Sequence, residues 1–478
     1  MPFKLVILWT DALVFVLVAA AVLFAWYVRR HEHLLTPWRR VARSTSGMAA
    51  LTILSFFIAS GLLDSLHYRP ALPDKGVQSV YAVEVLSVLD AVVGPLRTEK
   101  EKTYSAPLAA HLYAKETMEL PGGRQVRDYP RLKFGGAHLE DPEADRAVDI
   151  ARRALYGAAA GAIVWLVAAT LLCALIASRG GTHIDAAWHA IWRDKIEVRW
   201  RAILITLGLV LLVFGSVVTL AAKYHVLGTD KVGQDVFYQA LKSIRTGLVI
   251  GTLTTLVMLP FALLLGIMAG YFRGWIDDVI QYVYTTLSSI PSVLLIAAAV
   301  LMMQVYIETH SGLFETVLAR ADLRLLFLCI ILGVTSWTGL CRLLRGEALK
   351  LREMEYIQAA HAFGVSHWRV ITRHILPNVM HIVLIAIVMD FSGLVLAEAV
   401  LSYVGVGVDP STISFGTMIN SARLEMAREP MVWWSLAAAF CFMLVLVLSA
   451  NLFADAVRDA FDPRIRAARP FGFKTLKA

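Results

Sequence analysis

Apolar runs separated by charged segments dominate this sequence. About nine of them are roughly 17 to 25 residues long, the length of helix that crosses about 30 Å of hydrocarbon. A β-barrel would alternate polar and apolar residues instead, so the pattern predicts an all-α integral membrane protein with about nine transmembrane helices. The predicted spans are residues 5–27, 47–65, 155–177, 202–222, 246–270, 279–305, 324–344, 379–400 and 432–453. The first run is too long for a signal-peptide core, so we expect it to be retained.

The distribution of basic residues predicts the orientation of these spans. Arg29 and Arg30 follow the first span, and Arg199 and Arg201 precede the fourth. Because short loops rich in arginine and lysine stay in the cytoplasm, alternation places the N-terminus outside and the C-terminus in the cytoplasm. Residues 66–153 are then one long external insertion, in which we find no catalytic or metal motif.

Composition agrees with this class. Hydrophobic residues make up 58% of the chain and the mean hydropathy is +0.63. The net charge of +8 is explained by cytoplasmic arginines, so a nucleic-acid partner is not expected. None of the four cysteines has another at ligand spacing, so neither a disulfide framework nor a zinc site is predicted. Within residues 66–153, the stretch from Val80 to Val93 is interpreted as a helix on the membrane surface.

One polar stretch, Glu355 to Asn378, lies between two predicted spans on the cytoplasmic side. Helical spacing gives its first part an apolar face formed by Tyr356, Ala359, Ala360 and Phe363. Gly364 suits the left-handed position that ends a helix, and Ser366 can cap a second helix that runs into Pro377. We predict two short helices joined at Gly364–Val365, forming a rigid docking element.

Two other groups of residues are candidates on the external side. In residues 227–238, Gly228 and Gly233 permit tight turns, and Asp230 and Asp235 can cap helix starts; a well-capped re-entry into the membrane explains them equally well. Glu398 lies inside a span, where an ionisable group suggests function but can also serve a helix partner.

Several chemistries have no motif here. The sequence contains no phosphate loop for ATP, no H-E-x-x-H zinc motif and no G-x-S-x-G nucleophile elbow, so we expect no enzyme. His361, His367 and His374 are six and seven residues apart, a spacing that does not place all three on one helix face. A metal site there is therefore not expected. Pro260 and Pro291 are predicted to kink their helices.

The polar stretch resembles a signature of the permease subunits of binding-protein-dependent ABC importers, in the dipeptide, oligopeptide and nickel branch. That signature is EAA, three residues, Gly, nine residues, then I-x-L-P. Its places are taken here by Gln358-Ala359-Ala360, Gly364 and Leu376-Pro377. Two positions depart from it, since Gln358 replaces Glu and His374 stands where Ile is frequent.

Three further segments are similar to motifs of the same branch. They are Leu227 to Val236, Ala397 to Val408 with Glu398 and Ser402, and Asp459 to Arg464. The resemblance implies a six-helix permease domain at 196–465 with a cytoplasmic coupling loop at about 346–378. It leaves an N-terminal extension, 1–195, with three extra spans and the insertion, and a basic tail, 466–478.

The resemblance also implies a mechanism in the bacterial inner membrane. The chain would form half of a translocation pathway for peptides or similar small solutes, with a second permease, two ATP-binding subunits and an external solute-binding protein. ATP and Mg²⁺ would bind those ATPases, so this chain would need no cofactor. The implied coupling residues are Glu355, Tyr356, Gln358, Ala359, Ala360, Phe363, Gly364, Leu376 and Pro377. The candidates for the pathway or external gate are Asp230, Gly233, Asp235, Glu398 and Ser402. A stand-alone secondary transporter or channel is the alternative, and the substrate is left open.

Overall fold

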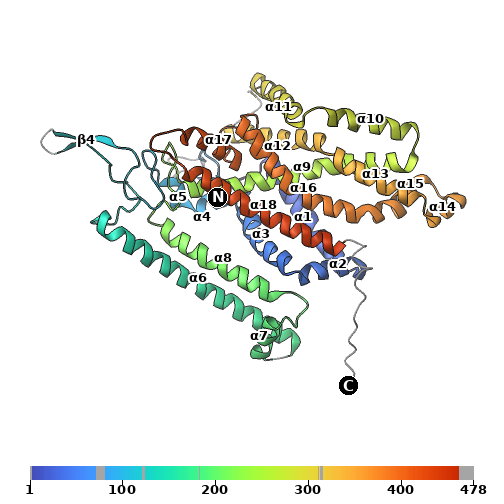
Figure 1. Cartoon of the computed structure of the whole chain (residues 1–478), viewed down its shortest axis with the longest axis horizontal. Helices are drawn as coiled ribbons and strands as arrows, with labels where there is room; N and C mark the ends of the chain where they lie inside the picture. Colours follow the sequence, from blue (N-terminus) through green and yellow to red (C-terminus); the bar gives the residue numbers. More distant parts are fainter. Residues whose placement is uncertain are drawn as a thin grey trace, which may run out of the picture.

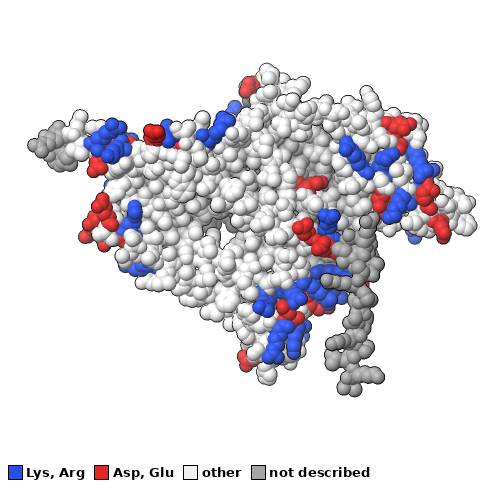
Figure 2. Space-filling model, viewed as in Figure 1, with Lys and Arg blue, Asp and Glu red and all other residues white. Residues whose placement is uncertain are grey.

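The computed structural model describes residues 3–71, 81–120, 124–181, 183–310, 312 and 316–461. Its helices run broadly along the longest axis, with the β4 hairpin at one end and helix α14 at the other (Figure 1). Lysines, arginines and carboxylates gather at the left and right ends of the view and around α2 and α7 at its lower edge, and the surface between these groups is mostly free of charged side chains (Figure 2). This distribution is that of a multi-pass membrane protein.

The extension and its insertion form the first part of the chain. Their helices are α1 (Trp9–Arg29), α2 (Glu32–Arg43), α3 (Thr45–Asp64), α4 (Val88–Val92), α5 (Gly94–Thr98), α6 (Pro142–Gly180) and α7 (Ile184–Trp192). Their strands are β1 (Phe3–Val6), β2 (His67–Pro70), β3 (Leu86–Ser87), β4 (Glu116–Leu120) and β5 (Arg124–Asp128). Strands β1, β2 and β3 form an antiparallel sheet in that order, and β4 and β5 form a separate antiparallel pair.

The second part of the chain is helical. Its helices are α8 (Trp200–Ala221), α9 (Val236–Phe272), α10 (Trp275–Ser289), α11 (Ser292–Thr309), α12 (Val317–Ser336), α13 (Thr338–Arg352), α14 (Glu355–Ala362), α15 (His367–Val370), α16 (Leu376–Val404), α17 (Phe415–Glu425) and α18 (Trp434–Phe461). A π-helical turn, Ile371–Ile375, joins α15 to α16.

The all-α membrane prediction is confirmed, with differences in the spans. Among the described residues, eight helical segments are long and apolar enough to cross a membrane: α1, α3, α6, α8, α9, α11, the continuous segment from α15 to α16, and α18. The seventh predicted span, 324–344, was misplaced: helix α12 begins and ends earlier, and a break at Trp337 separates it from α13. Arg320, Asp322 and Arg324 occupy the start of α12, so its apolar part is shorter than those of the other spans.

The predicted single span 279–305 was wrong. The structure divides it into α10 and α11 at Ile290–Pro291, where Ile290 has extended backbone angles. Proline disfavours the helical conformation of the residue before it, so Pro291 ends one helix and starts the next, and does not merely kink one. Pro260, in contrast, lies inside the continuous helix α9.

The insertion contains less helix than expected. Within Val80 to Val93 only α4, Val88–Val92, is helical, and it follows strand β3 directly; Val80 itself lies outside the described residues. The Ser87 hydroxyl and the Asp90 carboxylate form a capping box that starts this helix. Strand pairing with β2 therefore replaces the first turns of the predicted surface helix.

Small residues bring the helices close together. A Cβ on Gly266 would lie 2.9 Å from the Cys341 carbonyl oxygen, and one on Gly270 would lie 2.6 Å from the Ala348 Cβ. These two glycines, four residues apart on one face of α9, give this helix its close packing on α13. Gly157 of α6, in the extension, meets Gly215 of α8 in the same way, and these two helices pack as an antiparallel pair (Figure 1).

Candidate coupling site and external loop

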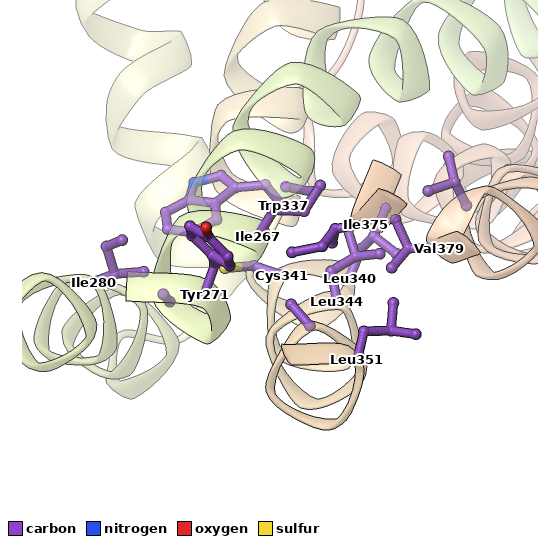
Figure 3. Packing of buried hydrophobic residues seen from close by; sticks show 14 of the residues in the cluster. Ile267, Tyr271, Ile280, Trp337, Leu340, Cys341, Leu344, Leu351, Ile375 and Val379 are labelled. Atoms are coloured by element: carbon purple, nitrogen blue, oxygen red, sulfur yellow. The ribbon is translucent and has the colours of Figure 1, made fainter. Parts of the chain in front are cut away.

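Helix α14 is held on the protein by one buried side chain. Ile357 is fully buried with Val370, Ile375 and Val379, in a cluster that continues into α9 and α13. Figure 3 shows Tyr271 of α9, Leu344 and Leu351 of α13 and Ile375 of the π-helical turn in this cluster. The tip of the molecule therefore rests on an apolar core and cannot swing freely without exposing it.

The predicted left-handed end of the first helix is confirmed at Gly364, whose φ is +72°. The Gly364 N–H donates to the His361 carbonyl at 2.9 Å, and the Val365 N–H donates to the Ala360 carbonyl at 3.0 Å. These are the two bonds of a Schellman motif, which satisfies carbonyls at a helix end. The chain consequently turns sharply after α14.

The second predicted helix differs from expectation. Ser366 is the N-cap of α15, but its side chain makes no capping hydrogen bond. The helix does not stop at Pro377, because the π-helical turn carries it directly into α16. Pro377 is the second residue of α16, so its missing N–H falls directly after the π-helical turn.

Three aromatic side chains stand out from this tip. Phe363 is 87% exposed, Trp368 is 71% exposed and Tyr356 is 45% exposed. Ala359 is exposed and Ala360 half-buried. Exposed aromatic groups of this kind mark interaction sites, because they offer large apolar area at low entropic cost. The sequence pattern indicated Tyr356 and Phe363, but neither Trp368 nor the buried anchor Ile357.

Polar contacts fix the rest of the tip. The Tyr271 hydroxyl lies 3.0 Å from His361 Nε2 and 2.8 Å from His367 Nδ1, so it joins the two sides of the turn to the end of α9. Gln358 donates to the Glu353 carbonyl at 3.3 Å, and the Tyr356 hydroxyl accepts from Asn378 at 3.3 Å. Glu355 is the first residue of α14, and Leu376 is the first residue of α16. Among the described residues, no cluster of three potential metal ligands occurs.

The loop between α8 and α9, which the basic-residue pattern predicts to be external and which is called the external loop below, contains Asp230, Gly233 and Asp235. Gly228 and Gly233 both have φ +72°, so the predicted tight turns are confirmed. Asp235 caps α9 by accepting from the Tyr238 N–H at 3.1 Å. Asp230 does not start a helix; its carboxylate accepts from the Val232 and Gln234 N–H groups and closes the turn.

Glu398 and Ser402 form a separate group. The Glu398 carboxylate is buried and accepts from the hydroxyls of Ser402 at 2.7 Å and Ser414 at 2.8 Å. The Ser402 hydroxyl also accepts from the Val408 N–H at 3.3 Å. This pair ties the loop after α16 back onto that helix. The five external candidates thus lie in two hydrogen-bonded groups with mainly structural contacts.

The structure adds a buried triad that joins the insertion to the external loop. His225 Nδ1 lies 2.8 Å from Asp235 Oδ2, and His225 Nε2 lies 3.5 Å from Glu101 Oε1, a distance that suits an ion pair better than a direct hydrogen bond. Glu101 also accepts from the backbone N–H groups of Lys133, Phe134 and Gly135. The charged run around Glu101 has no periodicity, so no pattern in the sequence marked it.

Burial and charge act in opposite directions in this triad. Burial disfavours the imidazolium, but the contacts with Asp235 and Glu101 outweigh it and raise the pKa of His225 to about 9. Burial likewise disfavours the Glu101 carboxylate, but His225 and the three N–H groups lower the pKa of Glu101 to about 2. The native triad therefore contains a charged histidine between two carboxylates.

The attachment of the insertion should weaken at alkaline pH. The raised pKa of His225 contributes stability that is complete below about pH 6.5 and is lost as the pH rises through about 9. The lowered pKa of Glu101 contributes stability that is lost only as the pH falls below about 4.5, so it does not affect the alkaline range. We expect the hydrogen-exchange protection factor of the Phe134 N–H to fall at least about tenfold between pH 6.5 and 9.5, or about 1.4 kcal/mol. His225→Gln should give a low protection factor with no such step. Equal steps in both proteins would contradict this assignment.

A second buried cluster joins the extension to the core between helices α1, α9 and α12. The Arg245 guanidinium of α9 lies 2.5 Å from Asp11 of α1 and 3.7 Å from Asp322 of α12. Asp11 also lies 2.8 Å from His67 Nδ1, and the Thr10 hydroxyl bonds to Asp322. Asp11 falls inside the first predicted span, and an ionisable residue at such a position is itself a signal. Its partner could not be known from the sequence.

Comparison with known proteins supports the assignment suggested by the tip. Residues 262–467 match the family described as "Binding-protein-dependent transport system inner membrane component". The chain is 34% identical over 245 residues to the oligopeptide transport system permease protein OppC of Mycobacterium tuberculosis, covering 51% of this chain and 78% of that protein. It is 32% identical over 245 residues to the glutathione transport system permease protein GsiD of Pectobacterium atrosepticum, covering 51% and 74%.

A third relative has the same extent. The dipeptide transport system permease protein DppC of Lactococcus lactis is 29% identical over 240 residues, covering 50% of this chain and 64% of that protein. The family match begins inside α9, at residue 262. The extension with its insertion, and the external loop, precede that match.

Proposed function

This chain belongs to the permease family of binding-protein-dependent ABC importers, and on that premise we propose that it carries peptides or similar small solutes across the bacterial inner membrane. The names of the relatives above, for oligopeptides, glutathione and dipeptides, support this class of cargo. The chain is a multi-pass permease subunit. In the proposed arrangement it pairs with a second permease, two ATPase subunits and an external solute-binding protein.

The observation that carries this proposal is the rigid, exposed tip formed by α14 and α15. Its aromatic side chains Tyr356, Phe363 and Trp368 would insert into a groove of an ATPase subunit on the cytoplasmic side. The buried anchor Ile357 and the Tyr271 contacts transmit movement of the tip to α9, α13 and α16. A lever of this kind couples ATP-driven closure of the ATPases to two states of the pathway. ATP and Mg²⁺ bind the partner subunits, and this chain performs no catalysis.

The orientation follows from the basic loops and counts α12, with its shorter apolar part, as a ninth crossing, because eight crossings would put both termini on the same side. The tip, the α2 helix and the loop from Arg193 to Arg201 face the cytoplasm, with the C-terminus, while the N-terminus and the insertion are external. The insertion contacts the external loop through Glu101 and His225. We place it near the dock of the solute-binding protein, a role that deletion of residues 66–153 tests through uptake.

Purification of the tagged chain from its native membrane tests the assembly. We expect two ATPase subunits and a second permease to copurify, and tripeptide uptake into proteoliposomes to require ATP and the binding protein. A complex that contains only this chain and transports without ATP would instead identify a stand-alone secondary transporter or channel. Collapse of the proton gradient should leave ATP-driven uptake unchanged, which separates the two mechanisms directly.

A further inference from the structure

A cavity of about 670 Å³ lies between the extension and the permease core. The extension contributes Leu8, Asp64, His67 and the segment 83–85 to its walls. The core contributes parts of α9, the first turns of α12 and the segment 411–413. Without residues 1–195, one side of this cavity would be absent. Its volume is within the range of about 300–1,000 Å³ that is usual for small-molecule sites.

The charges around the cavity do not balance. Lys242 lies 2.6 Å from Asp64 and 3.2 Å from Asp90, while Arg245 is shared by Asp11 and Asp322. Four carboxylates thus surround two permanent cations and His67, which pairs with Asp11. When all four are ionised, at least one negative charge stays unmatched even if His67 is protonated. Of these carboxylates, Asp64 and Asp322 line the cavity itself.

An unmatched charge in a buried wall is costly unless a carboxyl group takes up a proton or a positive group approaches it. A ligand with an ammonium group supplies that charge, whereas an anionic ligand increases the imbalance. The apolar remainder of the wall, with Leu8, Val317, Leu318 and Leu325, suits small aliphatic side chains. These features together describe a site for a short molecule with one cationic end.

We propose that this cavity is a binding chamber for the N-terminal ammonium group of a short peptide, with Asp64 and Asp322 facing that group. The proposal rests on the proposed peptide cargo and adds a specific site to it. The extension then has a role in transport, because it completes the chamber beside the external ends of α9 and α12. A solute released by the binding protein would bind there before it crosses the membrane.

Direct binding to the complete membrane complex in nanodiscs tests the chamber, without binding protein or nucleotide. Isothermal titration with trialanine should give a saturable heat, and N-acetyl-trialanine, which lacks the ammonium group, should bind at least about tenfold more weakly, a difference of about 1.4 kcal/mol. Asp322→Asn should weaken the binding of trialanine and leave the binding of N-acetyl-trialanine unchanged. Equal binding of both peptides, or no binding of trialanine, would overturn the proposal.

A cavity-filling variant locates the binding. Val317 lines the cavity and is 62% exposed, so Val317→Trp places a large ring at its edge without disturbing the core. It should weaken trialanine binding at least about tenfold. The matched control is Val92→Trp, at a 67% exposed position on α4 that does not line the cavity, and it should bind as the native protein does. Native binding in Val317→Trp would place the peptide elsewhere and overturn the chamber.

Uptake by the complex with its binding protein separates this proposal from the proposed function. ATP-driven trialanine uptake without direct binding to the membrane complex would overturn the chamber and leave the peptide importer intact. Direct binding that depends on the ammonium group, without uptake, would support the chamber and overturn the peptide cargo. Absence of both would overturn both.

Discussion

Gly364→Val should reduce ATP-driven uptake roughly 5–30-fold while the protein still inserts and assembles. The native φ of +72° is strongly unfavourable for a β-branched residue and costs about 1–2 kcal/mol. This energy lowers the population of the native helix end by a factor of about 5–30. A Cβ at this position meets no atom within 4 Å, so steric clash is not the cause. Relaxation of the strain would instead turn α14 away from its seat, and move Phe363 with it. Proteoliposome uptake and copurification of the ATPase measure the effect.

Two further variants separate conformation from contact at this site. Gly364→Asn should retain most uptake, because asparagine tolerates the left-handed region. Gly346→Val makes the same change on α13, at an exposed helical glycine whose Cβ also meets nothing. It should transport as the native protein does. Normal uptake in Gly364→Val, or equal loss in Gly364→Asn, would show that the turn at Gly364 does not control coupling.

Asp11→Ala should destabilise the protein by about 3–5 kcal/mol, the typical cost of leaving one member of a buried ion pair without its partner. The Asp11 side chain is completely buried, and it contacts both Arg245 and His67. Among the described residues, its loss leaves Asp322, at 3.7 Å, as the one carboxylate within 4 Å of the Arg245 guanidinium. A large fall in Tm in nanodiscs should result, with easier proteolysis between the extension and the core.

The control removes an ion pair of similar chemistry at the surface. Glu347→Ala breaks the contact with Lys350, a neighbouring helical pair whose lysine is mostly exposed, and should change stability by at most about 0.5 kcal/mol. Replacing both Asp11 and Arg245 by leucine should restore part of the lost stability, because the Arg245 cation is no longer buried without its main partner, although Asp322 then loses its nearest cation. A Tm change in Asp11→Ala no larger than in Glu347→Ala would contradict a structural role for this pair.

Local signals predicted the parts of the coupling tip that depend on neighbouring residues. The left-handed end at Gly364 and the cap at Asp235 follow from backbone geometry that a few adjacent residues impose. The π-helical turn before Pro377 escaped prediction, since the sequence pattern does not distinguish a helix that stops from one that widens and continues. The break at Pro291 was underestimated for a related reason: proline can kink or end a helix, and packing decides between these outcomes.

The sequence by itself determined that this is a helical membrane protein with a docking element between two spans, because hydropathy and turn chemistry are local properties. Only the tertiary structure decided how the extension is joined to the permease core. Glu101 contacts His225, and Asp11 contacts Arg245, across more than a hundred residues of chain. Such pairs depend on which helices pack together, and no local period encodes their partners. The cavity between extension and core exists for the same reason, as its walls come from segments that only folding brings into contact.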